Sequence, residues 1–278
     1  PGGFAEASLL PKLAIKTLNK DYYSIDFGEM LSKAISKKIK KNGTIMFVHC
    51  TSYSDDRQVM QYIGDKMRNL GYKSIYGAAD HLIFKNKEAI SILNNYEGKV
   101  DCIFRFTPLE WLKDIKPKTW SGYFDTITPS CNHPIAIFAQ TKRFPLVWNI
   151  LEQNGIKMTT WKEMLSDTKE VKDFKEGYIY KPAFGRVGEN ISIKEACSKE
   201  EYLKIIKDVK RHPKNYIAQK KFISKPIKID NKEYHVCLGS YTVDGKQAGF
   251  YARISELPRI DSYAADIPVV IERTKNDK

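Results

Sequence analysis

A lysine, an arginine and two glycines stand close together in the second half of the sequence. The stretch "YIYKPAFGRVGENISI", residues 178–193, places Lys181 in an apolar run and follows it with Gly185, Arg186 and Gly188. A glycine-containing tip between two strands lets backbone N–H groups approach an anion, and the two cationic side chains add charge and donors. The pattern suits a phosphate site, but from the residues alone a plain hairpin turn with surface cations is the commoner explanation, because glycine-containing turns between strands are frequent.

The segments around this loop predict a helix packed against antiparallel strands. We expect strands in "GYIYKPAF", "NISI" and "YIAQKKFI", and a hairpin with its turn at Asp244-Gly245 inside "HVCLGSYTVDGKQAGFYARI". Helices are predicted in "SKEEYLKIIKDVKR", which Ser198 can cap, and in "TKRFPLVWNILEQNG", which Gly155 can end. The second half is therefore expected to be α+β.

The first half alternates helical and apolar segments. An amphipathic helix is predicted over 26–41, a buried strand over 44–50, a helix capped by Ser54 and ended by Gly71, and further strands over 72–76 and 99–106. Strand, helix and strand in this order predict a Rossmann-like α/β layer with parallel strands. We take "TPSCNHP" as the linker and expect two domains, 1–130 and 131–278.

The usual nucleotide-binding loops do not occur in this first layer. Neither GxxxxGK[ST] nor GxGxxG follows any of its predicted strands. A doubly wound nucleotide site is therefore not expected there.

The charge and hydropathy of the sequence narrow the class of protein. The net charge of +13 and the pI near 9.3 suit an anionic partner, but the lysines are spread over the whole length and fall on predicted helix faces, so nucleic-acid binding is disfavoured. No apolar run approaches the ~18 residues of a membrane span, and no signal sequence opens the chain. The sequence predicts a soluble, cytoplasmic protein without a membrane partner.

The cysteines and histidines suggest no metal site. The five cysteines are widely spaced with no CxxC pair, and the five histidines have no partner at metal-ligand spacing, so we expect reduced thiols, structural or surface histidines, and no metal ligand in this sequence. Cys50 ends a predicted strand, where a thiol nucleophile could be placed, but no second motif supports a thiol hydrolase.

Five segments, in order, resemble the glutathionylspermidine synthase family. Around the loop, "YIYKPAFGRVGENISI" is similar to the family's strand and lid; the others are "FRFTPLEWL" (104–112), "QTKRFPLVW" (140–148), "YIAQ" (216–219) and "GSYTVDGKQAGFYARI" (239–254). The resemblance implies a Rossmann-like pre-ATP-grasp layer followed by an ATP-grasp domain with an antiparallel sheet. It also implies an ATP- and magnesium-dependent ligase that joins a small-molecule or peptide carboxylate to a polyamine-like amine through an acyl phosphate.

The resemblance assigns roles to particular residues. Lys142 and Lys181 would contact the nucleotide phosphates, and Gln219 would lie beside the adenine. The lid would consist of Gly185, Arg186, Gly188 and Asn190. Arg253, which would approach the transferred phosphoryl group, and Arg186 would be the catalytic residues. A mobile lid is expected over 185–189, with the two lysines facing one cleft.

Some residues depart from the family pattern. Thr141 stands where the family usually has asparagine, Lys220 follows the glutamine where an acidic residue is frequent, and Ile254 follows Arg253 in place of glutamate. The family's magnesium ligands precede a "PGGFAEA" segment, with which this chain begins, so they are expected upstream of Pro1. A module that binds a nucleotide or an acidic partner without catalysis is the alternative.

Overall fold

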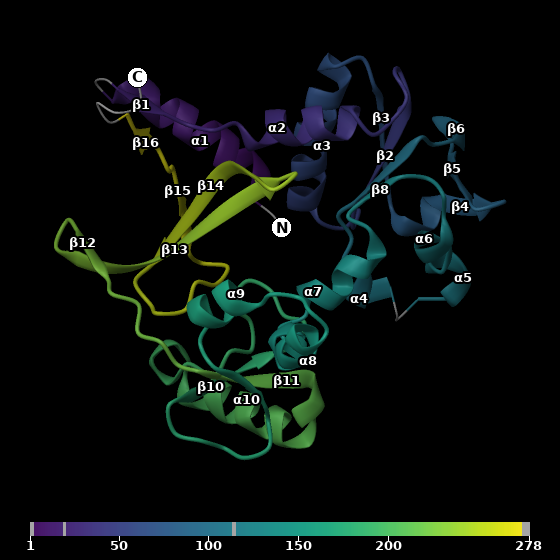
Figure 1. Ribbon diagram of the computed structural model, residues 1–278. Coiled ribbons are helices and arrows are strands. Elements are labelled where there is room, and N and C mark those ends of the chain that lie inside the picture. Colours follow the sequence, from purple (N-terminus) through teal and green to yellow (C-terminus); the bar gives the residue numbers. More distant parts are fainter. Residues whose placement is uncertain (1–2, 19–20, 113–114, 274–278) are drawn as a thin grey trace. The chain divides into compact units, whose positions relative to one another are not determined.

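The computed structural model describes residues 3–18, 21–112 and 115–273. These residues form two compact units (Figure 1). The first unit runs to Ala136 and also includes Leu238–Ala252 and the chain from Asp266 onward, whereas the second contains Ile137–Cys237 and Arg253–Ala265. The chain leaves the first unit after Ala136 and later returns to it twice, so the units are not the two continuous segments 1–130 and 131–278, and the domain boundary at residue 130 stays a prediction. Every helix within the described ranges is too short or too polar to cross a bilayer.

A parallel sheet forms the centre of the first unit. Strand β2 lies between β3 and β7 and pairs with both in parallel, and β8 pairs in parallel with the far side of β7. All five residues of β2 are buried, which explains why its sequence is continuously apolar. The Rossmann-like layer predicted from the sequence is confirmed. The strands are β2 (Thr44–Val48), β3 (Lys73–Gly77), β7 (Cys102–Arg105) and β8 (Ser130–Cys131).

Three helices pack with this sheet, and two of their predicted ends were wrong. They are α1 (Phe4–Thr17), α2 (Phe27–Ser36) and α3 (Ser54–Asn69). Helix α2 ends at Ser36, well before residue 41, because four of the next five residues are lysines whose like charges would repel one another at helical spacing. Ser54 is the first helical residue of α3 and not its cap; Tyr53 holds the cap position without a side-chain hydrogen bond.

The segment between β3 and β7 forms a separate antiparallel sheet that the sequence analysis did not predict. Its strands are β4 (Leu82–Lys85), β5 (Glu88–Leu93) and β6 (Tyr96–Lys99), in that order. Asn86 and Lys87 connect β4 to β5 with positive φ angles, as a tight hairpin turn requires. Short helices accompany these strands. They are η1 (Ala79–His81), α4 (Leu109–Leu112), α5 (Pro117–Trp120), α6 (Gly122–Asp125) and η2 (Pro134–Ala136).

The predicted hairpin near the end of the chain is confirmed. Strands β13 (Lys232–Val243) and β14 (Lys246–Ser255) are joined at Asp244 and Gly245, whose φ angles of 49° and 74° fit the type I′ pattern. They form a sheet in the order β12-β13-β14-β15. The remaining strands are β12 (Ile227–Ile229), β15 (Ala265–Ile267) and the pair β1 (Tyr22–Tyr23) and β16 (Ile271–Glu272).

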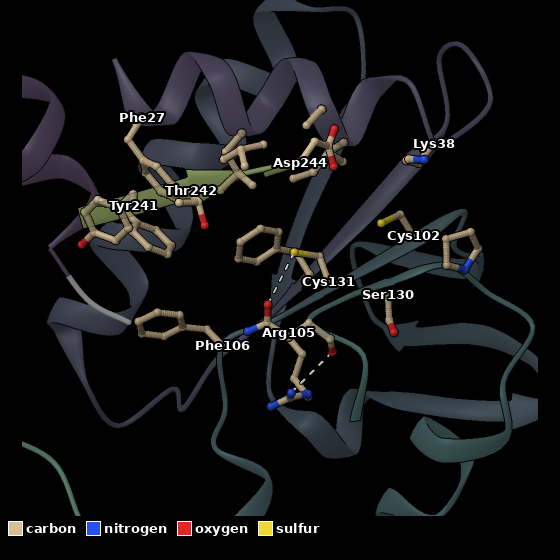
Figure 2. Close-up of a pocket in the computed structure, with 18 residues that line it drawn as sticks. Phe27, Lys38, Cys102, Arg105, Phe106, Ser130, Cys131, Tyr241, Thr242 and Asp244 are labelled. Carbon is tan, nitrogen blue, oxygen red and sulfur yellow. Dashed lines mark hydrogen bonds between the residues drawn. The ribbon is translucent and has the colours of Figure 1, made fainter. Parts of the chain in front are cut away.

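Aromatic side chains attach this hairpin to the core of the first unit. Tyr241 packs on Phe4 and Phe27, with ring centroids 5.8 and 4.3 Å away. The same rings border a mostly apolar cavity of about 380 Å³ (Figure 2). At its other side the Arg105 guanidinium donates to the Asn132 carbonyl at 3.4 Å. Burial raises the pKa of the Cys102 thiol to about 12, so this thiol stays protonated at neutral pH.

In the second unit, a three-stranded antiparallel sheet packs against one long helix. Strand β11 (Tyr216–Lys220) lies between β10 (Tyr178–Pro182) and β9 (Thr168–Glu170). Helix α10 (Lys199–Arg211) places Ile205 and Val209 against Tyr180 and Ala218. Ser198 caps α10 as predicted, its hydroxyl accepting a hydrogen bond from the Glu201 N–H at 3.0 Å. The shorter helices are α7 (Ile137–Gln140), η3 (Phe144–Val147), α8 (Trp148–Gln153), α9 (Thr159–Met164), η4 (Lys194–Ala196) and η5 (Pro213–Asn215).

The strand predicted in "NISI" is wrong. Ser192 does lie beside β10: its N–H donates to the Tyr180 carbonyl at 3.1 Å, but the Tyr180 N–H donates to the Ser192 hydroxyl at 2.7 Å and not to a backbone carbonyl. The Ser192 hydroxyl thus takes the place of one of the backbone carbonyls that would accept a hydrogen bond between paired strands. Ile193 then bonds back to Ile191, and η4 begins at Lys194.

Candidate functional site

Lys181 and Gln219 lie on the sheet face opposite helix α10. In the register of β10 and β11, Lys181 pairs with Ile217 and Ile179 with Gln219, so Lys181 and Gln219 are diagonal neighbours on one face. The Lys181 ammonium donates to Gln219 Oε1 at 2.7 Å, and Gln219 Nε2 donates to Thr168 Oγ1 at 3.0 Å. The predicted phosphate ligand and the predicted adenine neighbour are therefore in direct contact.

Lys142 approaches the same region from the turn before η3. Its N–H donates to the Ala183 carbonyl at 2.9 Å, and its ammonium donates to the Gly185 carbonyl at 2.7 Å. Burial lowers the pKa of Lys181, and the positive charge of Lys142 lowers it further. The second unit thus holds two ammonium groups near each other at the base of the glycine-containing loop, which favours an anionic ligand there.

The loop itself is a tight turn. The Glu189 N–H donates to the Arg186 carbonyl at 2.9 Å, and the two residues between them, Val187 and Gly188, have φ angles of 48° and 67°. A Cβ at position 188 would lie 2.7 Å from the Ile260 carbonyl oxygen, so only glycine fits. Glycine is therefore needed at position 188 both for the turn and for the close approach of the Ile260 backbone. The mobility of the loop stays a prediction.

A cavity of about 640 Å³ opens beside this face of the sheet. Its volume lies in the range of small-molecule sites. Lys181 and Gly188 border it, together with the apolar side chains of Ile179, Ile191 and Phe222. Phe222 is 63% exposed, so much of its ring is available for contact. The cavity therefore joins an apolar wall to a cationic one, as a ligand with a flat apolar part and an anionic part requires.

Arg259 is a cavity residue that the sequence analysis missed. Its guanidinium donates to Glu201 at 2.7 Å, to Asp261 at 3.3 Å and to the Cys197 sulfur at 3.3 Å. Burial opposes its charge, but these two carboxylates outweigh that effect and raise its pKa. Its aliphatic part lies against the tip of the turn, where a Cβ on Gly188 would come within 3.1 Å of it. Arg259 stands in no recognisable motif, so only the fold reveals that it supports the turn.

The other predicted site residues are placed less closely together. Arg186 and Asn190 are exposed at the two sides of the turn, and Asn190 has a φ of 53°. Arg253 is half-buried near the end of β14 and donates to the Ala264 carbonyl at 2.8 Å. Among the described residues, Lys181 and Gly188 line the cavity, whereas the other predicted site residues do not; these are Lys142, Gly185, Arg186, Asn190, Gln219 and Arg253. Their roles stay predictions.

The described residues do not fit a divalent metal ion. Across 3–18, 21–112 and 115–273, no group of three or more histidine, cysteine, aspartate or glutamate side chains is arranged to hold one. The carboxylate that borders the cavity, Glu195, is paired with Lys221 at 2.5 Å. Since Mg²⁺ prefers several oxygen ligands, we derive no chemical step through a metal at this site.

Comparison with known proteins relates most of the chain to one family. A search of curated proteins finds no match. In contrast, the family described as "Glutathionylspermidine synthase preATP-grasp" matches residues 15–272, which is most of the chain. The match includes both compact units, the parallel sheet of the first and the lysine-bearing sheet of the second. The chain belongs to the glutathionylspermidine synthase family.

Proposed function

We propose that this chain is an ATP-dependent ligase that joins a carboxylate to an amine through an acyl phosphate. Membership of the glutathionylspermidine synthase family supports ligase-like chemistry that uses ATP. The observation that carries the proposal is the pair of neighbouring ammonium groups, Lys142 and Lys181, at the base of the loop that contains Gly185 and Gly188. In this proposal the second unit provides the ATP-grasp site.

The two lysines would hold the nucleotide phosphates. Each ammonium at present donates to a neutral oxygen, Lys142 to the Gly185 carbonyl and Lys181 to Gln219 Oε1. A phosphate between them would offer charged acceptors and would offset both the burial of Lys181 and its repulsion by Lys142. Binding of the anion would therefore raise the pKa of Lys181 toward its ordinary value.

The adenine would lie against the apolar wall of the cavity. Ile179 and Ile191 supply flat aliphatic contact, and the exposed ring of Phe222 can pack on a heterocycle. Gln219 is buried and already makes hydrogen bonds to Lys181 and Thr168, so its role would be to position Lys181 between the adenine and the phosphates.

The reaction would occur in two steps. A carboxylate oxygen attacks the γ-phosphorus of ATP and displaces ADP; the amine nitrogen then attacks the acyl carbon, loses a proton and displaces phosphate. The chain's contribution would be to neutralise charge on the transferred group, with Arg186 on the turn and Arg253 on β14 as the proposed arginines. The substrates we propose are a thiol-peptide carboxylate and a polyamine-like amine.

The test is ATP turnover that depends on both substrates. Phosphate release from ATP and Mg²⁺ is measured with a thiol tripeptide and spermidine, each omitted in turn, for the unchanged chain and for Lys181→Met. Lys228→Met, an exposed position on β12, is the matched control. Any turnover should require both substrates; we expect a loss of about 100-fold in ATP affinity for Lys181→Met, equivalent to about 2.7 kcal/mol, and no change in the control.

Two other outcomes have definite meanings. ATP binding by calorimetry that is lost in Lys181→Met, without turnover under any combination, would favour the module that binds nucleotide without catalysis. ATP binding that is equal in all three proteins would show that Lys181 does not contact the phosphates, and would overturn the proposed site.

A further inference from the structure

A second cavity lies at the carboxyl edge of the parallel sheet in the first unit. The strand order is β3-β2-β7-β8, so the chain builds β2 first, adds β3 on one side and later β7 on the other. The direction of winding therefore reverses between β2 and β7. In open parallel sheets, ligands bind in the crevice beyond the carboxyl ends of the two strands at such a switch point. A cavity of about 510 Å³ occupies this position, lined by residues that follow β2, β3 and β7.

Two residues that line this cavity each contain a buried polar atom with no hydrogen-bond partner among the described residues. The two atoms are Nδ1 of His49, which directly follows β2, and Oγ1 of Thr107, which lies just beyond β7. His49 is 3% exposed and Thr107 is 7% exposed. The backbone brings them together, because the Thr107 N–H donates to the carbonyl of Val48, the residue before His49, at 3.3 Å. Buried polar groups are nearly always paired, so these two atoms call for a partner from outside the chain.

The remaining wall of the cavity indicates the shape of that partner. Trp111 on α4 lines it and leaves 42% of its surface exposed, so a flat ligand can pack on the indole. Leu112 and Ala79 make the inner wall apolar. A planar ring therefore fits between the indole and the two polar atoms better than a flexible chain does.

The described charges around the cavity balance each other, which favours an uncharged partner. Among the residues that the structure describes, one anionic residue, Asp80, and one cationic residue, Lys116, line it, and both are exposed. No glycine occurs between the end of β2 and α3, or between β7 and α4, so the loops lack the close-approach residues that phosphate-binding turns use. The hydroxyl of Thr107 can donate or accept, and His49 Nδ1 does either according to its tautomer.

We propose that this pocket binds a small, planar, uncharged heterocycle that carries a hydrogen-bond donor beside an acceptor, the chemical class of the nucleobases and of nicotinamide. Its edge bonds to His49 Nδ1 and Thr107 Oγ1, and its face packs on Trp111. The site is separate from the proposed ATP site, because all of its lining residues belong to the first unit.

The test compares two buried threonines of the same strand pair. Adenine and nicotinamide are titrated into the full chain and followed by amide NMR shifts of residues 49–51 and 107–111, for the unchanged protein, Thr107→Val and Thr44→Val. Thr44 is a matched control, because it is also 7% exposed but starts β2 at the opposite end of the sheet. Benzoate, planar but charged, tests the charge preference, and Trp111→Leu tests the packing of the ring.

We expect saturable shifts around the pocket, at least tenfold weaker binding in Thr107→Val and in Trp111→Leu, and unchanged binding in Thr44→Val. The melting temperature of Thr107→Val should be equal or higher, because valine has the same shape and removes an unpartnered hydroxyl. Three results would overturn the proposal: no shift with millimolar adenine and nicotinamide, which would leave water as the partner of the two atoms; equal binding in the two threonine variants; or tighter binding of benzoate.

Discussion

The two units each partly bury a charged side chain, and they surround it in opposite ways. In the first unit, Asp26 accepts hydrogen bonds from Lys12, from Lys66 at 3.0 Å and from the Glu29 N–H at 2.9 Å. In the second unit, Lys181 contacts a neutral amide oxygen and is repelled by Lys142. Burial disfavours the charge of both groups, but the partners of Asp26 outweigh that effect and lower its pKa to about 2, whereas Lys142 adds to it.

This difference separates a charge that stabilises the fold from one that is available to a ligand. Asp26 caps α2 and forms ion pairs with Lys12 on α1 and Lys66 on α3. Its negative charge is therefore compensated by groups of the protein itself. Lys181 gains from an added anion, because its described contacts leave its charge poorly compensated. If the comparison is right, removing Asp26 harms stability and removing Lys181 does not.

The largest effect is expected for Asp26→Ala. The change removes the cap hydrogen bond and the lysine interactions that together lower the pKa, so the free energy of unfolding should fall by about 2 kcal/mol. Urea denaturation measures this loss. Glu29→Gln is the control, because the pair of Glu29 with Lys33 is exposed and should contribute less than about 0.5 kcal/mol. Equal effects for the two variants would show that Asp26 is not the anchor.

The dependence of the unfolding free energy on acidic pH should reflect the protonation of Asp26. The folded pKa of Asp26 is below its unfolded value, so the unfolded chain binds the proton more readily and the stabilisation is complete above about pH 4. It should be lost as the pH falls toward 2, by about 2 kcal/mol. The difference in unfolding free energy between the unchanged protein and Asp26→Asn should therefore shrink across this window. A difference that is constant with pH would mean that uncharged contacts of Asp26 dominate.

Lys181→Met should change stability by less than about 1 kcal/mol at neutral pH, since it removes a poorly compensated charge but leaves Gln219 Oε1 without its donor. The sign of the pH effect is opposite to that of Asp26. A lysine whose folded pKa is lowered costs stability at neutral pH, and the cost disappears as the pH rises through the folded pKa toward 10.5. The stability of the variant relative to the unchanged protein should therefore decrease between pH 7 and pH 10.5. A loss of more than 2 kcal/mol at neutral pH would contradict the comparison.

The elements of the fold that could be predicted are those whose pattern is local. Continuous apolar runs identified β2 and β7, the Asp244-Gly245 pair identified the hairpin, and Ser198 identified the start of α10. The prediction failed where a tertiary contact replaced the local rule. The alternation in "NISI" is typical of a strand, but the hydroxyl of Ser192 takes one of the hydrogen bonds that a strand partner would make.

The candidate site was predictable only in part for the same reason. The resemblance to the family selected Lys142, Lys181 and Gln219. The register of β10 and β11 brings Lys181 and Gln219 into contact, and Lys142 bonds to the Gly185 carbonyl at the base of the loop. Arg259 was missed because its contacts with Glu201 and the turn join positions far apart in the sequence. His49 was taken as structural, and its unpartnered Nδ1 is visible only once β2 and β7 lie side by side.

The smallest effect is expected in the turn beside Lys181, where the second unit contains a further unfavourable feature. Val187 has a φ of 48° and is 46% exposed, so a β-branched side chain occupies a left-handed conformation with little packing to compensate. Val187→Asn should relieve this strain and raise the free energy of unfolding by about 0.5 kcal/mol.

Gly188→Ala should instead lower the free energy of unfolding, and by a larger amount, because a Cβ there meets the Ile260 carbonyl oxygen at 2.7 Å. Gly155→Ala is the control, because position 155 has a φ of 83° and open space around it, so the variant measures the cost of the positive φ without a steric contact. Thermal unfolding of the three variants measures these differences, and amide exchange at 186–190 shows whether they are confined to the turn. Destabilisation by Val187→Asn would mean that the valine side chain, and not the backbone, holds the turn in place.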